Sequence, residues 1–449
     1  MPPMFQKYAS MAVPRYTSYP TVPHFDSGVG GRGYAGWLEA LNPAEPVSLY
    51  LHVPFCRKLC WYCGCNMKLA SRYEPVADYV ETLIRELELV AEHLLGRVGL
   101  SHLHFGGGTP TALEPDDLER VMDAVRAHFT VNEGAELAIE SDPRTLTPEM
   151  TRRIGALGFT RASFGIQEFD AKVQKAINRI QPEEMVVSAV KGLRDAGITG
   201  INFDLIYGLP HQTVDTLRAT IAACAALKPD RLALFGYAHV PWMAKKQRLI
   251  DEAALPGAQE RIDQAAAAAR MILAAGYEAI GLDHFALPHD ELAIAARQGT
   301  LRRNFQGYTT DKARTLLGVG ATSIGRTPSG YVQNIAETGA WARAVTSGAL
   351  PVAKGHAFQG EDTLRGDVIE ALMCRGQVDL DDAIRHHGAT PDCFETELEA
   401  LAAMESDGLV TVDGPVLRLT EEGKPLVRTV ASVFDAYLST GAARHSVAV

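Results

Sequence analysis

The chain has 449 residues, of which 47% are hydrophobic and 22% are charged, and its formal net charge is −11. This length predicts a large catalytic unit with an accessory domain, and the acidic charge argues against a nucleic-acid or anionic-membrane partner. Because no apolar run reaches about eighteen residues and the first ten residues lack a signal-peptide core, we expect a cytoplasmic protein.

Residues 1–47 form the first predicted segment, an N-terminal arm rich in proline, glycine and tyrosine. One short helical stretch is expected near Tyr34–Leu41. The arm carries the sequence PRYTSYPT, from Pro14 to Thr21. We expect the arm to act as a lid that keeps water and oxygen away from the catalytic domain.

Four cysteines lie within ten residues, directly after the apolar run SLYLHV, and their spacing is C-x3-C-x2-C-x-C. Three thiolates at such spacing can hold three irons of a cubic iron–sulfur cluster, which leaves a fourth iron open to a substrate. A structural zinc knuckle or a buried cysteine cluster is the alternative, although zinc usually recruits two separated ligand pairs. The four are Cys56, Cys60, Cys63 and Cys65.

The remaining cysteines are scattered, which indicates a reducing compartment rather than a disulfide framework. They are Cys224, Cys374 and Cys393. The histidines show no H-E-x-x-H pairing, so no second metal site is expected.

From residue 48 to about 240, short apolar runs alternate with amphipathic stretches, which implies parallel strands joined by right-handed crossovers. The strand candidates are Leu49–Val53, Leu103–Phe105, Leu137–Glu140, Ala162–Ile166, Ile201–Ile206 and Leu232–Tyr237. The helix candidates are Pro75–His93, Pro115–Phe129, Pro182–Ala196 and Val214–Leu227.

Polar residues stand at the ends of several of these strand candidates. Gly106–Thr109 follows the run HLHF, and glycines there let the backbone approach a ligand closely. Glu140 ends the run LAIE and suits an ammonium or a ribose. Asp204 lies inside INFDLIYG, where an unpaired carboxylate would be costly, so a partner is expected.

Residues 241–355 are expected to extend this catalytic domain, which would then span 48–355, and residues 356–449 read as a separate helical domain. Helices at 362–374, 379–387 and 391–407, a hairpin around Val412–Gly414 and a closing helix predict a winged-helix-like module. The helix in the recognition position carries six acidic residues and no Lys or Arg. Phosphate binding needs the opposite charge, so DNA binding is not expected.

The chain resembles the oxygen-independent coproporphyrinogen III oxidases, a family of radical S-adenosylmethionine (SAM) enzymes. The C-x3-C-x2-C spacing is that of the superfamily, whereas Cys65 and the PRYTSYPT arm match this family. Further matching motifs, in one order, are GGGTPT, IESDPR, GIQEF, INFDLIYGLP, FGYAHVP, GLDHFALP and RNFQGYTT. The resemblance implies an α/β fold in which residues 48–240 form a (β/α)6 partial TIM-type barrel, with the chemistry at the C-terminal ends of its strands.

The resemblance also implies a reaction. Cys56, Cys60 and Cys63 would ligate a [4Fe–4S] cluster whose open iron binds SAM, and one electron would split SAM into methionine and a 5′-deoxyadenosyl radical. That radical would take a hydrogen atom from a propionate side chain, and loss of CO2 and one electron would leave a vinyl group. Two such events would convert coproporphyrinogen III into protoporphyrinogen IX. Cys65 would be catalytic without ligating the cluster, and its alternatives are a spare ligand or an inert thiol.

By the same resemblance, the family holds two SAM molecules. The positions matching contacts to the cluster-bound SAM are Tyr50, Gly107, Glu140 and Ile324. The positions matching contacts to the second SAM are Gly108, Thr109, Gln167, Arg179, Asp204 and Ala238. Arg179 is alternatively a surface helix charge.

For the substrate, Arg15 and Arg303 are the leading partners of the propionate groups, with structural ion pairs as the alternative. Pocket lining is expected from Tyr16, Tyr19, His284 and Tyr308, and His284 is alternatively a core histidine. We also expect the protein to be a monomer that receives electrons from a small electron donor, such as a flavodoxin or a ferredoxin.

Two other functions compete with this one. Haem-binding, chaperone-like paralogues share the barrel and the first three cysteines but typically lack the last cysteine and the arm, both of which this chain has. A zinc-stabilised scaffold with a winged-helix partner module is the second alternative.

Overall fold

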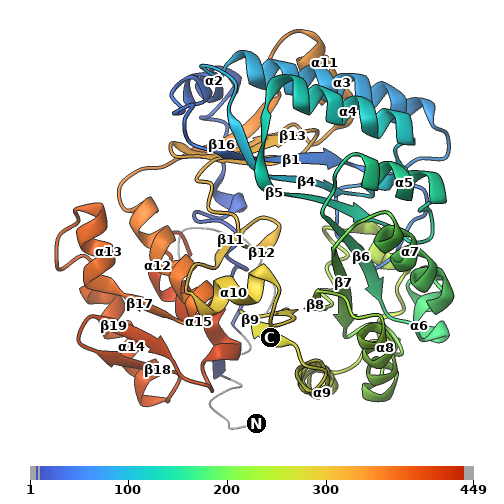
Figure 1. Ribbon diagram of the computed structural model, residues 1–449. Coiled ribbons are helices and arrows are strands. Elements are labelled where there is room, and N and C mark those ends of the chain that lie inside the picture. The colour runs from blue at the N-terminus through green and yellow to red at the C-terminus, as the bar shows by residue number, and fades with distance from the viewer. Residues whose placement is uncertain (1–6, 9–10, 439–449) are drawn as a thin grey trace. The chain divides into compact units, whose positions relative to one another are not determined.

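The computed structural model describes residues 7–8 and 11–438 (Figure 1). The contacts within the chain divide it into two compact units. We call Asp26–Tyr277 with Asp311–Gly355 the large unit, and the remainder, Met1–Phe25, Glu278–Thr310 and His356–Val449, the small unit. The three segments expected from the sequence, 1–47, 48–355 and 356–449, remain a proposal about domains. Among the described residues, no helix combines the length and the apolar character needed to span a membrane.

Parallel strands form the centre of the large unit, in the sheet order β1-β4-β5-β6-β7-β8. The side chains on one face of these strands, such as Leu51, Phe105 and Ile139, are apolar and buried, whereas the opposite face carries polar side chains such as Tyr50 and His104. Every predicted strand is confirmed, and the α/β fold class with it. The bounds are β1 Val47–Val53, β4 Gly99–Gly107, β5 Thr130–Ser141, β6 Arg161–Gln167, β7 Gly200–Tyr207 and β8 Arg231–Gly236.

A helix follows each of these strands. The four predicted amphipathic helices are confirmed as α3, α4, α7 and α8, and α3 packs beside α4, as Figure 1 shows. Two short helices, α5 and α6, were not predicted, because fewer than three turns give too few periodic positions. The bounds are α3 Glu74–Glu92, α4 Pro115–His128, α5 Pro148–Ala156, α6 Ala171–Ala176, α7 Glu183–Asp195, α8 Val214–Ala226 and α9 Ala258–Ala274.

The extension after residue 310 adds strands to the same sheet. β13 (Leu316–Val319) pairs parallel with β1, and β14 (Ile324–Thr327) continues antiparallel to it. The sheet therefore extends past β1, and β14 begins at the edge where the parallel strands end. The neighbouring elements are α2 Gly31–Glu39, β15 Gly330–Asn334, α11 Thr338–Thr346 and β16 Val352–Ala357.

The small unit contains two hairpins and a helical module. The hairpins pair β9 with β10 and β11 with β12. Their bounds are β9 Glu278–Ile280, β10 His284–Ala286, β11 Arg302–Asn304 and β12 Gly307–Thr309, with α10 at Glu291–Arg297 between them.

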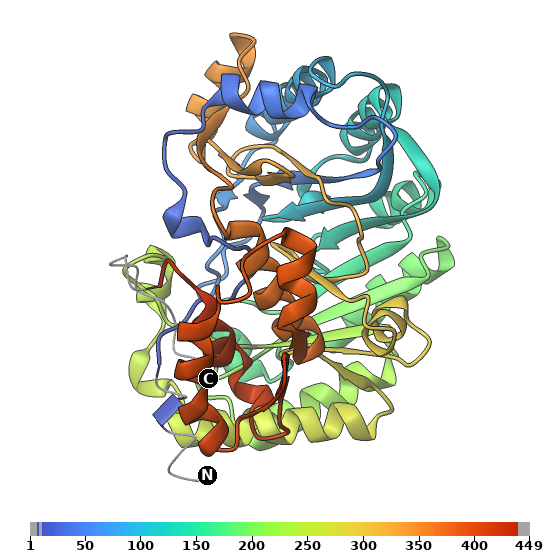
Figure 2. The same cartoon turned by 90° about the vertical axis from the view of Figure 1, so that its left-hand side faces the viewer.

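The C-terminal module of the small unit has the winged-helix-like element order expected from the sequence. Three helices precede the hairpin of β18 and β19, which β17 joins in the strand order β17-β19-β18 (Figure 1). Figure 2 shows this module, in orange and red, from another side. Apolar side chains from all three helices, including Leu372, Ile384 and Leu401, form its core. The bounds are α12 Asp362–Arg375, β17 Gln377–Asp379, α13 Leu380–His387, α14 Glu395–Ser406, β18 Val410–Asp413, β19 Val416–Leu419 and α15 Val427–Ala431.

Candidate active site

The cysteine loop leaves β1 of the large unit and is closed at its base. β2 (Phe55–Cys56) pairs parallel with β3 (Lys68–Leu69), so the chain returns beside its own starting point. Within this loop Cys60 is buried and Cys65 is exposed. The short pairing holds all the predicted ligands in one closed turn of chain.

Side chains from two other strand–helix connections brace the loop. The Asn178 side-chain amide, after β6, donates to the Leu59 carbonyl at 2.7 Å. The Gln247 amide, after β8, donates to the Tyr62 carbonyl at 2.8 Å. These bonds satisfy backbone groups that no regular ladder reaches. The connections after β6 and β8 therefore fix the shape of the loop.

Buried cations surround the Cys60 sulfur. Arg144 Nη2 lies 3.2 Å and Arg179 Nη1 lies 3.4 Å from Cys60 Sγ. Asp142 joins the two guanidinium groups, at 2.6 Å from Arg144 and 3.5 Å from Arg179. Cationic donors at this distance stabilise a thiolate or other negative sulfur. Arg179 is therefore no surface charge, and Arg144 is a residue that sequence reasoning missed.

The loop thiols differ in their proton affinity. Burial raises the pKa of the Cys56 thiol to about 11, whereas a hydrogen bond from Cys65 lowers the pKa of Cys63 to about 6. In the described part of the chain, the three loop sulfurs are not gathered within 4.8 Å of one another, as ligands of a single ion would be. A soft set of thiol donors supported by cations fits an iron–sulfur cluster.

The glycine run after β4 brings backbone close to the loop. Gly107 has φ +116°, and a Cβ there would stand 2.6 Å from the His52 ring. A Cβ on Gly108 would stand 2.8 Å from the Phe55 carbonyl oxygen. Only glycine fits these two positions, so the predicted close approach of backbone is present. The Gly107 N–H donates to the Glu140 carboxylate at 3.1 Å.

Two histidines that sequence reasoning missed complete this end of the sheet. The Tyr50 hydroxyl lies 3.0 Å from His52 Nδ1, and the Tyr50 ring stacks on His104 with centroids 5.8 Å apart. His104 Nε2 lies 3.3 Å from Glu140. The signal was available, because His52 and His104 alternate with apolar residues near the ends of β1 and β4. Tyr50, Gly107 and Glu140 thus form one connected polar group.

The other predicted SAM positions lie along the same edge of the sheet. Gln167 ends β6 with φ +67°, and its buried Oε1 has no hydrogen-bond partner among the described residues. Thr109 Oγ1 lies 3.4 Å from Cys56 Sγ. Asp204 pairs in register with Gly165, whose carbonyl accepts from Arg179 at 3.0 Å. Ala238 follows β8, and Ile324 begins β14.

A cationic cluster occupies the small unit. Arg303, on β11, donates to the Arg15 carbonyl at 3.4 Å, and its guanidinium lies 4.4 Å from the centroid of the Tyr308 ring. His284 meets the same ring edge-on at 5.3 Å. Arg303 Nε and Nη1 are buried and have no hydrogen-bond partner among the described residues. Three of the predicted substrate residues are thus brought into contact, with exposed Arg15 beside them.

The two arm tyrosines have structural partners. The Tyr16 hydroxyl donates to Asp435 at 3.0 Å, and the Tyr19 hydroxyl accepts from the Ala436 N–H at 3.1 Å. Both rings are buried in the core of the small unit. Packing therefore accounts for the positions of both side chains.

Comparison with known proteins identifies the family. Residues 50–224 match the model of the radical SAM superfamily. A curated relative from Bradyrhizobium diazoefficiens, named oxygen-independent coproporphyrinogen III oxidase, is 49% identical over 442 residues, which cover 98% of each chain. The chain belongs to the oxygen-independent coproporphyrinogen III oxidase family. Within it, the Escherichia coli relative of the same name is 40% identical over 439 residues, covering 97% of this chain and 95% of that one.

A solved structure of the family shows the same fold. Coproporphyrinogen III oxidase (HemN) from Escherichia coli, described as a radical SAM enzyme, superposes with a TM-score of 0.91 at 38% identity. The match covers 94% of this chain and 98% of that structure. Membership of the radical SAM family implies a [4Fe–4S] cluster and SAM, and the cysteine loop fits that cluster. The comparisons support the oxidase and not the haem-binding alternative.

Proposed function

We propose that this protein decarboxylates two propionate side chains of coproporphyrinogen III to vinyl groups, giving protoporphyrinogen IX without oxygen. SAM is the source of a 5′-deoxyadenosyl radical for each event. Per event, a propionate loses one hydrogen atom to that radical, then CO2, and then one electron, which a separate electron acceptor takes up. The observation that carries the proposal is the closed cysteine loop with its buried arginines, in a chain similar over nearly its full length to oxidases of this name.

Cys56, Cys60 and Cys63 would hold the three irons of the cluster that need protein ligands. When bound, the cluster supplies an open coordination position for SAM and one electron for its reductive cleavage. Arg144 and Arg179 stabilise the negative charge of the Cys60 sulfur, at 3.2 and 3.4 Å. Because charge-assisted hydrogen bonds to sulfur raise the reduction potential of such a site, these arginines ease delivery of the electron.

Cys65 is proposed as a catalytic thiol rather than a ligand. It is the exposed member of the loop, and its backbone N–H donates to Cys63 Sγ at 3.4 Å. Lys246 donates to the Cys65 carbonyl at 3.3 Å, which fixes the backbone of this residue. The Cys65 side chain therefore stays beside the ligands without being needed by them.

The first SAM is assigned to the connected polar group at the ends of β1 and β4. Glu140 offers a carboxylate to the SAM ammonium, and Gly107 keeps the approach open because it has no side chain. Tyr50 and Ile324 supply the walls. The contacts that support this assignment are those of Glu140 to the Gly107 N–H and to His104.

The second SAM is assigned to Gly108, Thr109, Gln167, Arg179, Asp204 and Ala238. The buried Gln167 Oε1, without a partner among the described residues, supports a ligand beside β6. Arg179 offers a cation for the carboxylate of that ligand, and Asp204 accepts from ribose hydroxyls. Binding stoichiometry tests the count directly. Reconstituted protein should bind two equivalents of SAM, and Asp204→Asn should bind one.

The four propionates of the substrate need cations, because the chain as a whole is acidic. Two buried guanidinium nitrogens of Arg303 have no hydrogen-bond partner among the described residues, and Arg15 lies beside it. A cation about 4 Å from a carboxylate contributes on the order of 4 kcal/mol at an effective dielectric near 20, which outweighs a diffuse net charge. We assign both arginines to propionate binding, with His284 and Tyr308 lining that position.

The remaining parts of the proposal concern the cellular setting. A small electron donor, a flavodoxin or a ferredoxin, serves a monomeric enzyme in the cytoplasm, where reduced iron–sulfur sites persist. Sedimentation of the reconstituted protein tests the monomer, and turnover with each purified donor tests the source of electrons.

The decisive experiment is an anaerobic turnover assay with reconstituted protein, a reductant, SAM and coproporphyrinogen III. Chromatography and mass spectrometry should detect protoporphyrinogen IX together with 5′-deoxyadenosine, and Cys56→Ala should produce neither. A protein with an intact brown cluster that binds haem but leaves coproporphyrinogen III unchanged would overturn the proposal in favour of the haem-binding function.

A further inference from the structure

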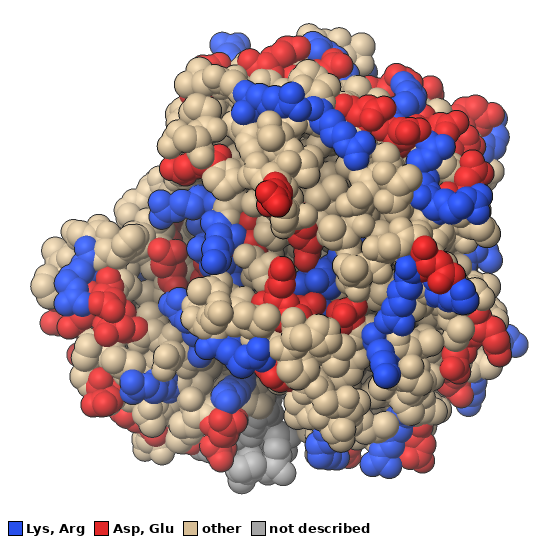
Figure 3. Space-filling model, in the orientation of Figure 1, with Lys and Arg blue, Asp and Glu red and all other residues tan. Residues whose placement is uncertain are grey.

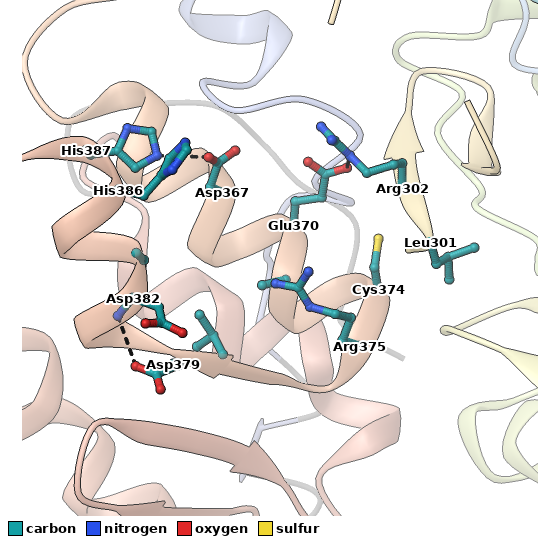
Figure 4. Close-up of a pocket in the computed structure, with 13 residues that line it drawn as sticks. Leu301, Arg302, Asp367, Glu370, Cys374, Arg375, Asp379, Asp382, His386 and His387 are labelled. Carbon is teal, nitrogen blue, oxygen red and sulfur yellow. Dashed lines mark hydrogen bonds and ion pairs between the residues drawn. The ribbon is translucent and has the colours of Figure 1, made fainter. Parts of the chain in front are cut away.

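A polar pocket in the small unit is lined by none of the residues assigned above. It lies between α12 and α13, has a volume of about 310 Å³, and is lined largely by charged and imidazole side chains (Figure 4). Its residues include Asp367, Glu370, Cys374, His386 and His387. A pocket with this lining needs an occupant that is itself polar or charged.

Two imidazoles and one carboxylate converge at one end of this pocket. The ligand atoms of Asp367, His386 and His387 all lie within 4.8 Å of one another. Asp367 is on α12 and both histidines end α13, so packing of the two helices sets the arrangement. His387 Nε2 lies 2.9 Å from Asp367 Oδ2, so the two atoms share one proton in a hydrogen bond. A metal ion that binds both atoms would replace this proton. Sequence reasoning expected no second metal site, because the ligands are 19 residues apart and form no H-E-x-x-H pattern.

An outer contact supports the same conclusion. The other ring nitrogen of His387, Nδ1, lies 3.4 Å from the Thr363 hydroxyl, also on α12. Ligating histidines normally donate their second N–H to such a partner, which fixes the ring and its tautomer. The geometry around His387 therefore resembles that of a ligand, with Nε2 directed at the carboxylate and Nδ1 held behind.

We propose that Asp367, His386 and His387 bind one divalent transition-metal ion, such as Zn²⁺, in the C-terminal module. Two imidazoles with one carboxylate suit zinc and its first-row neighbours, whereas magnesium and calcium select oxygen ligands. The remaining coordination positions face the pocket and take water. The metal joins α12 to α13.

The neighbouring charges are compatible with a cation. Glu370 is paired with Arg302 at 2.8 Å, and Asp382 is paired with Arg385, so neither competes for the metal. Cys374 lines the same pocket, but its sulfur is not among the atoms gathered within 4.8 Å. The site is therefore predicted to have nitrogen and oxygen ligands only, unlike the cysteine loop.

The test uses untagged, full-length protein with its cluster reconstituted, because a polyhistidine tag or empty loop thiols would bind zinc. Equilibrium dialysis against Zn²⁺, with iron and zinc counted separately, should give one zinc per chain. His386→Ala and Asp367→Asn should each weaken zinc binding at least about 10-fold, and Thr363→Val should weaken it about 10-fold. His128→Gln, a substitution elsewhere on the surface, should leave zinc binding unchanged.

Two further measurements keep the outcome decisive. X-ray absorption at the zinc edge should show a shell of nitrogen and oxygen without sulfur, and excess Mg²⁺ should not displace the zinc. Zinc should raise the melting temperature of the wild type but not of His386→Ala, because a ligand that binds only the folded state stabilises it. Equal zinc binding by wild type and His386→Ala, or a sulfur shell, would overturn the proposal.

Discussion

The cysteine loop of the large unit and the cationic cluster of the small unit are built in opposite ways. The loop holds its four cysteines within ten residues and closes on itself through β2 and β3. The cluster joins Arg15 to residues between 283 and 308, which lie hundreds of positions away in the chain. The cysteine loop is therefore contained in one stretch of sequence, whereas the cationic cluster forms only when the chain folds.

This difference has an energetic consequence. Closing a short loop costs little entropy, and a handful of hydrogen bonds from Asn178 and Gln247 then fix it. The cationic cluster depends on the packing of several segments, each of which must first be ordered. We therefore expect changes in the loop to abolish chemistry outright, and changes in the cluster to weaken substrate binding by degrees.

The largest effect is expected when one loop ligand is removed. Cys60→Ser should lose the cluster and all cleavage of SAM, because serine oxygen is a poor ligand for iron–sulfur clusters. Iron content, the brown colour and 5′-deoxyadenosine production measure this. Cys393→Ser, which changes a scattered cysteine, should keep all three. Retention of a full cluster by Cys60→Ser would show that the loop does not act as a local unit.

The next effect concerns the buried ions that support the loop. Asp142→Asn leaves Arg144 and Arg179 without their shared anion, and breaking such a buried pair costs about 3 to 5 kcal/mol of unfolding free energy. Urea denaturation followed by circular dichroism measures the loss. Asp123→Asn, whose partner Arg126 is at 3.8 Å on the surface, should change stability by less than about 1 kcal/mol. Equal losses in the two variants would contradict the prediction.

The stability of the large unit is expected to depend on pH through the buried carboxylate of Glu136. Burial alone would raise the pKa of Glu136, but Arg161 and Arg231 outweigh it and lower the pKa to about 2. Because the folded pKa is below the ordinary value of 4.5, the stabilisation is complete above 4.5 and is lost as the pH falls towards 2. The amount is about 3 kcal/mol.

Glu136→Gln should therefore destabilise the protein near neutral pH and flatten the acid limb of its stability curve. Urea midpoints recorded at descending pH measure this. Asp283 is the corresponding carboxylate in the small unit. Burial would raise its pKa, but hydrogen bonding and charge from His284, together with the charges of Arg303 and Arg15, hold the pKa below its usual value. An acid limb of unchanged slope in Glu136→Gln would assign the acid sensitivity to other carboxylates.

The smallest effect is expected in the cationic cluster. Arg303→Met removes charge-assisted hydrogen bonds worth about 1.5 to 3 kcal/mol, so KM for coproporphyrinogen III should rise about 10- to 100-fold. Cleavage of SAM without substrate should be unchanged, because the loop is intact. Arg297→Met removes a half-exposed arginine paired with Glu278 in the same unit and should leave KM unaltered. Loss of SAM cleavage in Arg303→Met would instead indicate a structural role.

Several short helices and strands could not be predicted from the sequence. Helices α3, α4, α7 and α8 and all the central strands were predicted, because apolar periodicity is a local property, but the long helix α9 was given no range. The helices α5 and α6 and the strands β13 to β16 were not predicted. β13 is only four residues long, and its place beside β1 follows from pairing with a strand more than 260 positions earlier. No local pattern encodes that partner.

The sequence by itself predicted an iron–sulfur site, because Cys56, Cys60 and Cys63 lie in one short loop and the type and spacing of these thiols need no distant partner. Tertiary structure decided which polar residues support that loop. Arg144, Arg179 and Asp142 become buried neighbours of Cys60 only when the connections after β5 and β6 converge. It also decided the contact between Arg15 and Arg303, and the convergence of Asp367 with His386 and His387. The physical reason is that charged side chains far apart in the chain come into contact only when the folded core brings their backbones together.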